Sequence, residues 1–132
     1  MSENFKIEIV NPEKSFLLKD NVSEVVVPAF EGEIGILKNH IPIISFLKPG
    51  IIKVFVGTEE ENYYVEDGIV EFKDNSLSIL TSSIFNLKDF DKNYINNSIS
   101  EAEKELTKNE IDDQKRFLLN HKIEVLKSLS IN

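Results

Sequence analysis

The sequence has no cysteine and no tryptophan, and only two of its 132 residues are histidine. The absence of cysteine excludes disulfides and thiol chemistry, and two histidines alone cannot build a Cys/His zinc site. Apolar residues make up 41% of the chain and charged residues 29%, a balance too apolar for wholesale disorder. A chain of this length can bury a core without disulfide or metal staples, so we expect one domain or two small ones.

Long hydrophobic runs are also lacking. The most apolar stretch, residues 41–47, is about seven residues long, whereas a membrane span needs about 20. The first ten residues have neither the apolar centre of a signal peptide nor the Arg-rich face of a transit peptide. We therefore expect a soluble protein that meets a membrane only through a partner.

Positive charge is scarce and unevenly placed. The 15 Lys and Arg face 23 Asp and Glu, and a net charge of −8 repels phosphate backbones, which argues against nucleic-acid binding. Residues 1–85 hold 7 Lys and 14 acids, whereas residues 86–132 hold 8 basic and 9 acidic residues. Within 114–132 the balance is positive, with Lys115, Arg116, Lys122 and Lys127 against Glu124 alone. This asymmetry predicts separate partners for the two halves.

The first half reads as strands. Phe5, Ile7 and Ile9 alternate with polar residues, the period of a half-buried strand. Further β-rich runs follow at 15–19, 23–27, 33–37, 42–47, 51–56, 62–66, 68–72 and 77–81, many of them separated by turn residues. Nine short strands at this spacing predict an antiparallel β-sandwich or flattened barrel over residues 1–85.

The second half, residues 86–132, has a helical period. Ile95, Ile99, Ala102 and Leu106 form one stripe, with Asp89 as the expected N-cap. A short turn follows at 107–110, in which Asn109 can take the left-handed conformation that ends a helix. It leads into a second helix over about 111–129 that Asp112 and Asp113 cap. Its apolar face is formed by Leu118, Leu119, Ile123, Val125, Leu126 and Leu129. The fold class expected for the whole chain is therefore α+β, an N-terminal antiparallel β-sandwich followed by an antiparallel α-helical hairpin.

Catalysis finds little support in the residues. The segment 31–35, EGEIG, lacks the Lys-Ser or Lys-Thr of a phosphate-binding loop, and no serine stands in a nucleophile-elbow pattern. We expect His40 to brace a loop, His121 to pack on the helix face, and the acids 59–61 to form a solvated hairpin turn. No acidic cluster has the spacing of a calcium loop, so no catalytic or metal site and no cofactor is predicted.

Two blocks of sequence resemble a known family. Residues 25–44 read VVVPAFEGEIGILKNHIPII, similar to the pattern V-x-x-P-G/A-x-E-G-E-x-G-I-L-x-x-H-x-P, and Lys48-Pro49-Gly50 follows at the expected distance. Residues 64–72, YVEDGIVEF, with SIL at 78–80, resemble the second block of the same family. Over essentially its whole length the chain resembles the epsilon subunits of bacterial and chloroplast F-type ATP synthases, which mitochondrial naming calls delta.

The resemblance implies a non-catalytic rotor subunit. With the gamma subunit, such a chain forms the foot of the central stalk on the membrane-embedded c-ring and couples proton flow to ATP synthesis. The loop 31–40 matches the family region near the c-ring, so Glu31, Glu33 and His40 are the candidate contacts there. Compartment follows as the cytoplasmic face of a bacterial inner membrane, with a plastid thylakoid origin as the alternative.

The resemblance also implies a regulatory hairpin. In relatives the extended helices block ATP hydrolysis by the catalytic alpha/beta head, which makes Lys115, Arg116, Lys122 and Lys127 candidate head contacts. Some relatives bind ATP through I/L-D-x-x-R-A at the start of the hairpin. Here residues 90–95 read FDKNYI, so Asp91 remains but Tyr94 replaces the Arg. We therefore predict weak or absent ATP binding.

Two other functions stay open at this stage. A stand-alone sandwich with its helices as a lid could bind a small molecule or peptide, and a concave pocket with convergent polar groups would favour that alternative. An exposed apolar face on the sandwich, suited to gamma, would favour the rotor subunit. A small hydrolase is the third candidate, although no nucleophile–base pair can be assembled from these motifs.

Overall fold

The computed structural model describes residues 3–13 and 15–130. Met1 and Ser2, the first two residues of the segment that lacks the features of a signal peptide, lie outside the described residues. The chain divides into two compact units, Met1–Leu87 and Lys88–Asn132. In the part of the chain that the structure describes, no helix is long and apolar enough to cross a membrane.

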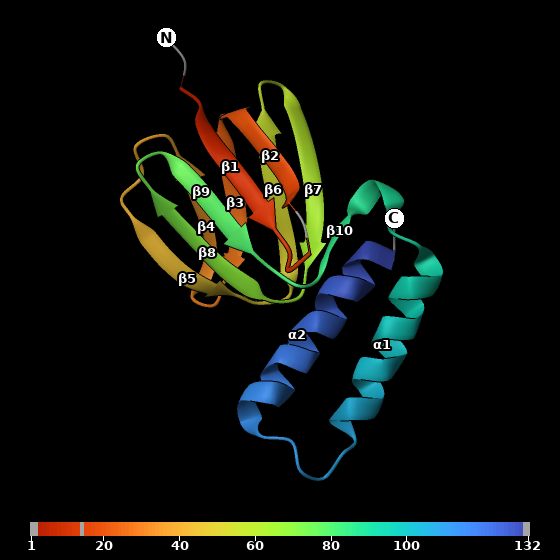
Figure 1. Cartoon of the computed structure of the whole chain (residues 1–132). Helices are drawn as coiled ribbons and strands as arrows, with labels where there is room; N and C mark the ends of the chain where they lie inside the picture. Colours follow the sequence, from red (N-terminus) through yellow and green to blue (C-terminus); the bar gives the residue numbers. More distant parts are fainter. Residues whose placement is uncertain (1–2, 14, 131–132) are drawn as a thin grey trace. The chain divides into compact units, whose positions relative to one another are not determined.

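The described residues of the first unit form one curled sheet (Figure 1). Its ten strands are β1 (Phe5–Val10), β2 (Ser15–Val22), β3 (Glu24–Ala29), β4 (Gly32–Leu37), β5 (Ile43–Leu47), β6 (Gly50–Val56), β7 (Glu59–Val65), β8 (Gly68–Lys73), β9 (Ser76–Leu80) and β10 (Ile84–Asn86). They are ordered β10-β7-β6-β3-β5-β8-β9-β1-β2, and β4 pairs with β3 on a branch from this path. The sheet folds over so that two layers face each other, and the predicted β-sandwich is confirmed (Figure 1).

One strand pair departs from the expected antiparallel pattern. β1 runs parallel to β9, with Ile7 opposite Leu77 and Ile9 opposite Ile79. These two strands are far apart in the sequence, so no tight turn forces them to run in opposite directions. The sheet is therefore mixed, and the short tenth strand β10 adds an antiparallel partner to β7.

The core lies between the two layers and follows the alternation seen in the sequence. In β1, Phe5, Ile7 and Ile9 are buried while Lys6 is exposed. Phe5 also packs edge-on against Phe72 of β8, with 5.5 Å between ring centroids. Other members of the core are Val22, Val25, Val27, Ile36, Leu47, Ile52, Val54, Val65, Val70, Leu77 and Ile79. Burial of this apolar set is the main stabilising term of the unit.

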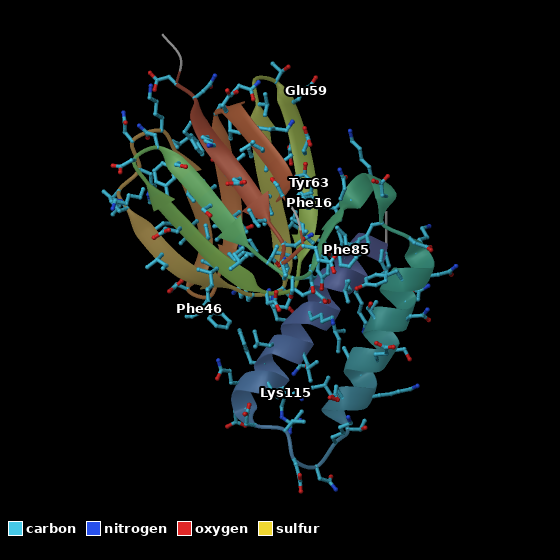
Figure 2. All side chains as sticks on the ribbon, in the orientation of Figure 1. Phe16, Phe46, Glu59, Tyr63, Phe85 and Lys115 are labelled. Carbon is cyan, nitrogen blue, oxygen red and sulfur yellow. The ribbon has the colours of Figure 1, made fainter. Side chains whose placement is uncertain are left out.

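Side chains of the edge strand β2 contact β7, the strand next to the other edge strand, β10. Lys19 Nζ lies 2.6 Å from Glu61 Oε1, and the Tyr63 hydroxyl donates to Glu61 Oε2 at 2.6 Å. Phe16 and Tyr63, labelled in Figure 2, pack edge to face at 5.7 Å. Burial, together with the Glu61 hydrogen bond, raises the pKa of Tyr63 well above its usual range.

These contacts correct the expectation for the acids 59–61. They belong to strand β7 and not to the turn, because Val56 pairs with Glu59 and leaves only Gly57 and Thr58 to make the hairpin connection. Gly57 has φ +61, a conformation that glycine adopts at little cost. A two-residue turn is enough here, so the strand begins earlier than the polar residues suggested.

The second unit is a pair of packed helices, α1 (Lys92–Leu106) and α2 (Asp113–Ser130), preceded by the 3₁₀ turn η1 (Leu87–Asp89). The helices are antiparallel (Figure 1), as expected. Each residue of the predicted α1 stripe is buried or half-buried, and so is each residue of the predicted α2 face.

Both helix ends of α1 differ from expectation. The N-cap is Asp91, whose side chain accepts from the Asn93 N–H at 2.9 Å, whereas Asp89 ends the 3₁₀ turn. The C-cap is Thr107 at φ −82°, and Asn109 does not take the left-handed conformation. The cap of α2 is as predicted, because Asp112 accepts from the Lys115 N–H at 2.7 Å.

Candidate functional site

The β3–β4 hairpin carries two of the predicted c-ring contacts. Ala29 pairs with Gly32, so Phe30 and Glu31 form a two-residue turn, and Gly32 follows at φ +135. Glu31 is exposed and accepts a 2.9 Å hydrogen bond from the Ser45 hydroxyl of β5. Glu33, two residues on, is also exposed. Both carboxylates are therefore presented to solvent at the same end of the sandwich.

His40 lies at the other end of β4. The segment 31–40 is mostly strand rather than the loop that we expected, and six strand residues separate its ends by about 17 Å. The His40 ring lies edge-on to Phe72 at 6.0 Å, with Nδ1 2.7 Å from the Ile41 carbonyl oxygen. The structure thus brings Glu31 and Glu33 together and separates His40 from them.

The connection that holds His40 is tied to the β8–β9 turn. The Asn39 N–H donates to Asn75 Oδ1 at 2.7 Å, and Asn75 Nδ2 donates to Asn39 Oδ1 at 3.0 Å. Asn39 and Asn75 both have positive φ, at 68° and 57°, which asparagine tolerates better than most residues. These reciprocal bonds fix the backbone beside His40, in keeping with a bracing histidine.

An apolar surface extends from the Glu31 turn across the outer face of the sandwich. We call it the outer apolar face and define it by its exposed members, Phe30, Ile44, Phe46, Ile69 and Leu80. Phe46 of β5 pairs with Ile69 of β8, which pairs with Leu80 of β9, so the three form one row across adjacent strands. Figure 2 shows the Phe46 ring projecting away from the sheet.

The sequence alone did not identify the residues of the outer apolar face. The signal is the run IISFL of β5, which is apolar at positions on both faces of the strand where a half-buried strand would alternate. Four of the apolar side chains, with Glu31 and Ser45, line a shallow hollow of about 260 Å³. A carboxylate at the margin of an exposed apolar surface is typical of a protein-binding site.

The predicted head contacts lie on α2, and two of them face carboxylates of α1. Lys115 Nζ is 3.5 Å from Glu105 Oε1, and Lys127 Nζ is 4.0 Å from Glu103 Oε2. Glu105 is shared, because Lys108 Nζ lies 2.8 Å from its other oxygen. The Lys108 hydrogen bond is the main reason why the pKa of Glu105 lies below its usual range.

The other two predicted head contacts also lie on α2. Arg116 is exposed and makes no ion pair with any described residue, whereas Lys122 is half-buried. All four cations therefore belong to one helix, as predicted. Figure 2 labels Lys115 in the first turn of that helix.

Asp91, the remnant of the nucleotide motif, is used as a helix cap. Its carboxylate accepts from the Asn93 N–H. Tyr94, at the position of the family's Arg, packs on Phe90 with 5.4 Å between ring centroids. An aromatic ring therefore stands where the family's guanidinium would receive a phosphate.

His121, the second histidine, is half-buried on α2. Its ring stacks on Phe117 of the same helix at 6.2 Å, with the ring planes 11° apart. Among the residues that the structure describes, no group of three or more His, Cys, Asp or Glu side chains could hold a metal ion.

Comparison with known proteins now decides the family. Residues 4–87 match the family described as ATP synthase, Delta/Epsilon chain, beta-sandwich domain. An ATP synthase epsilon chain from Pelagibacter ubique (strain HTCC1062) is 66% identical over 130 residues, which span 98% of this chain and 100% of the relative. The chain belongs to the ATP synthase epsilon chain family.

More distant relatives agree. An ATP synthase epsilon chain from Leptospira interrogans (strain Fiocruz L1-130) is 41% identical over 79% of this chain and 82% of its own length. The fold matches a chain in a Euglena gracilis mitochondrial ATP synthase structure with a TM-score of 0.77 at 20% identity, covering 99% of this chain and 82% of that one. A chain of the Tetrahymena thermophila central stalk and c-ring structure matches with a TM-score of 0.66 at 13% identity, covering 98% of both chains.

Family membership confirms the resemblance found in the sequence. The chain is a non-catalytic epsilon subunit of the F-type ATP synthase central stalk, and it takes part in proton transport and ATP synthesis. Its relatives from Pelagibacter and Leptospira are bacterial. The stand-alone binding module and the small hydrolase are therefore set aside.

Proposed function

We propose that the chain contacts three partners within the synthase through three separate surfaces. The outer apolar face binds the gamma subunit, the Glu31 turn faces the c-ring, and the cations of α2 reach the catalytic alpha/beta head and inhibit ATP hydrolysis. One observation carries this proposal. The first compact unit has an exposed apolar face and an acidic turn, whereas the second has a cationic helix. The sandwich unit would thus anchor the chain while the hairpin regulates.

The assignment of gamma to the outer apolar face rests on exposure. Ile44 is 72% exposed and Phe46 is 61% exposed, which is unusual for large apolar side chains so close together. Burying them against a partner removes apolar area from water and supplies the affinity that a permanent stalk contact needs. A groove between gamma elements rich in aliphatic side chains is the expected counterpart.

The assignment of the c-ring to the Glu31 turn rests on charge and position. Two exposed carboxylates project from one tight hairpin, and they would meet basic polar loops of the ring. Charges at the rim of an interface steer and orient partners more than they add affinity. His40 is not included, because its ring packs on Phe72 at the far end of β4.

Cross-linking can test these two contacts, because the chain has no cysteine of its own. In the assembled complex, a single cysteine at Glu31 should cross-link to the c-ring and one at Phe46 should cross-link to gamma. A single cysteine at His40 should give no product with the c-ring. A c-ring product from His40→Cys with none from Glu31→Cys would contradict the assignment.

The regulatory part of the proposal concerns reach. α1 has 15 residues and α2 has 18, so the helices are about 22 and 27 Å long, and an extended arm spans about 50 Å. Lys115, Arg116, Lys122 and Lys127 would then face an acidic segment of the catalytic head. Alanine at all four positions should abolish inhibition if charge carries it, while unchanged inhibition would remove the electrostatic explanation.

Nucleotide is not proposed as a ligand of this hairpin. Asp91 is committed to the helix cap and Tyr94 replaces the expected cation. Calorimetry with ATP at millimolar concentration should therefore give no saturable binding, and saturation in that range would show that other cations compensate.

We further propose that the chain lies at the cytoplasmic face of a bacterial inner membrane, held there only through the complex.

A further inference from the structure

Two of the four cations assigned to the catalytic head already face carboxylates inside the hairpin. Lys115 of α2 faces Glu105 of α1 at 3.5 Å, and Lys127 faces Glu103 at 4.0 Å. Both carboxylates lie in the last turn of α1, whereas Lys115 lies in the first turn of α2 and Lys127 near its far end. Neither lysine can face a carboxylate of α1 and a carboxylate of another subunit equally well at the same time.

Opening the hairpin would leave Glu105 with an ion-pair partner but would leave Lys115 without one. Lys108 lies three residues after Glu105, and its Nζ is 2.8 Å from Glu105 Oε2, closer than Lys115 Nζ is to the other oxygen. This contact is local in sequence and needs only the last turn of α1. When α2 leaves, Glu105 therefore keeps a cation while Lys115 is released without one.

We propose that Glu103 and Glu105 act as an internal competitor of the catalytic head, holding Lys127 and Lys115 while the hairpin is folded and releasing them when it extends. This inference rests on the proposed inhibitory role of the hairpin. It assigns to α1 a regulatory function that depends on ionic strength, because exposed ion pairs weaken as salt screens them. Glu103 and Glu105 set the equilibrium between the folded and the extended hairpin. Lys115 and Lys127 bind these carboxylates in the folded hairpin and the catalytic head in the extended one.

The first arm of the test measures hairpin opening in the isolated full-length chain. Spin labels are attached through Asn97→Cys in α1 and Asn120→Cys in α2, both exposed positions in a chain that has no other cysteine. The double variant Glu103→Gln/Glu105→Gln should raise the population at long label separations by about two- to fivefold at low salt. At an ionic strength near 0.5 M the difference from the unmodified chain should vanish.

The control removes one negative charge from α1, where the double variant removes two, and leaves both ion pairs intact. Glu101 is exposed on α1 and has no ion pair with any described residue, so Glu101→Gln should leave the distance distribution unchanged. An equal rise in Glu101→Gln and in the double variant would mean that net charge alone opens the hairpin. An unchanged double variant would mean that the pairs do not hold it. Either result overturns the proposal.

The second arm measures inhibition of ATP hydrolysis by the matched catalytic head. Glu103→Gln/Glu105→Gln should lower the half-inhibitory concentration of the chain by the same two- to fivefold. Lys115→Gln should weaken inhibition less than Arg116→Gln, because Lys115 gives up the Glu105 contact on opening whereas Arg116 gives up none of the described ion pairs. Equal losses from the two variants, or unchanged inhibition by the glutamine pair, would contradict the competition.

The two arms separate the inference from the proposed function. In one outcome the labels move apart in the double variant, but even the unmodified chain fails to inhibit ATP hydrolysis. The proposed head contact and the competition for it are then both wrong, although the ion pairs still stabilise the hairpin. If the unmodified chain inhibits and the labels do not respond to the glutamines, the inhibitory arm stands and the internal competitor does not.

Discussion

Truncation of Phe46 to alanine tests the gamma-binding face directly. A phenylalanine side chain buries about 200 Å² when fully covered, and Phe46 is 61% exposed, so about 120 Å² is available to a partner. At about 25 cal/mol per Å², covering that area stabilises the complex by up to about 3 kcal/mol. Because alanine keeps a small part of it, we expect a loss of about 2–3 kcal/mol, or roughly 30- to 150-fold in Kd.

The assay is calorimetric or surface-based titration of isolated gamma with the full-length chain. Phe46→Ala should hardly change the stability of the fold, because Phe46 lies outside the core. The contact that the variant loses is with the exposed Phe30 ring of the neighbouring turn, at 6.5 Å between centroids. Leu18→Ala serves as the matched control, since Leu18 of β2 is 59% exposed but lies four strands from β5. Unchanged gamma binding by Phe46→Ala, or an equal loss in Leu18→Ala, would refute the assignment.

Three further predictions concern the fold that presents these surfaces. Gly68→Ala should lower the free energy of unfolding in urea by about 3 kcal/mol or more, because φ is +146 and a Cβ would lie 2.6 Å from the Leu80 carbonyl oxygen. Gly57→Ala, at φ +61 with open space around it, should lower it by only about 1 kcal/mol. Equal losses in the two variants would contradict the steric explanation. Asp91→Ala should destabilise α1 by about 1 kcal/mol, measured as faster amide exchange in its first turn, and Asp91→Asn should largely preserve the protection. Tyr63 has a raised pKa in the folded state, so its stabilising contribution is complete below about pH 10, the pKa of an unfolded tyrosine, and is lost as the pH rises further. Unfolding at pH 9 and pH 11 should show that loss, and a Tyr63→Phe chain with the same pH dependence would contradict it.

The layout of the sandwich could be predicted because local signals set most of its strands. Alternation in Phe5, Ile7 and Ile9 identified β1 and its buried face, and turn residues marked most of the hairpins. The parallel β1–β9 pair could not be predicted, because it joins segments separated by most of the sandwich and no local residue pattern encodes it. The two-residue turn at Gly57 likewise moved the start of β7 earlier, which only the cross-strand register reveals.

The candidate site was predicted unevenly. Glu31, Glu33 and His40 are close in sequence, but each residue of an extended strand adds about 3.4 Å, so His40 lies at the far end of β4. The outer apolar face depends on the pairing of β5, β8 and β9, and its row of side chains exists only after those strands align. The ion pairs of Lys115 and Lys127 depend in the same way on how α1 and α2 pack.

The most direct test of the regulatory account is the rate of ATP hydrolysis by the matched catalytic head, stripped of this subunit and titrated with the full chain or with residues 1–87. The sandwich has its own core, so the shorter chain should fold and bind. We predict that both chains bind the head and gamma complex but that only the full chain lowers hydrolysis. Equal inhibition by both chains, or binding by both with no inhibition, would contradict a regulatory hairpin.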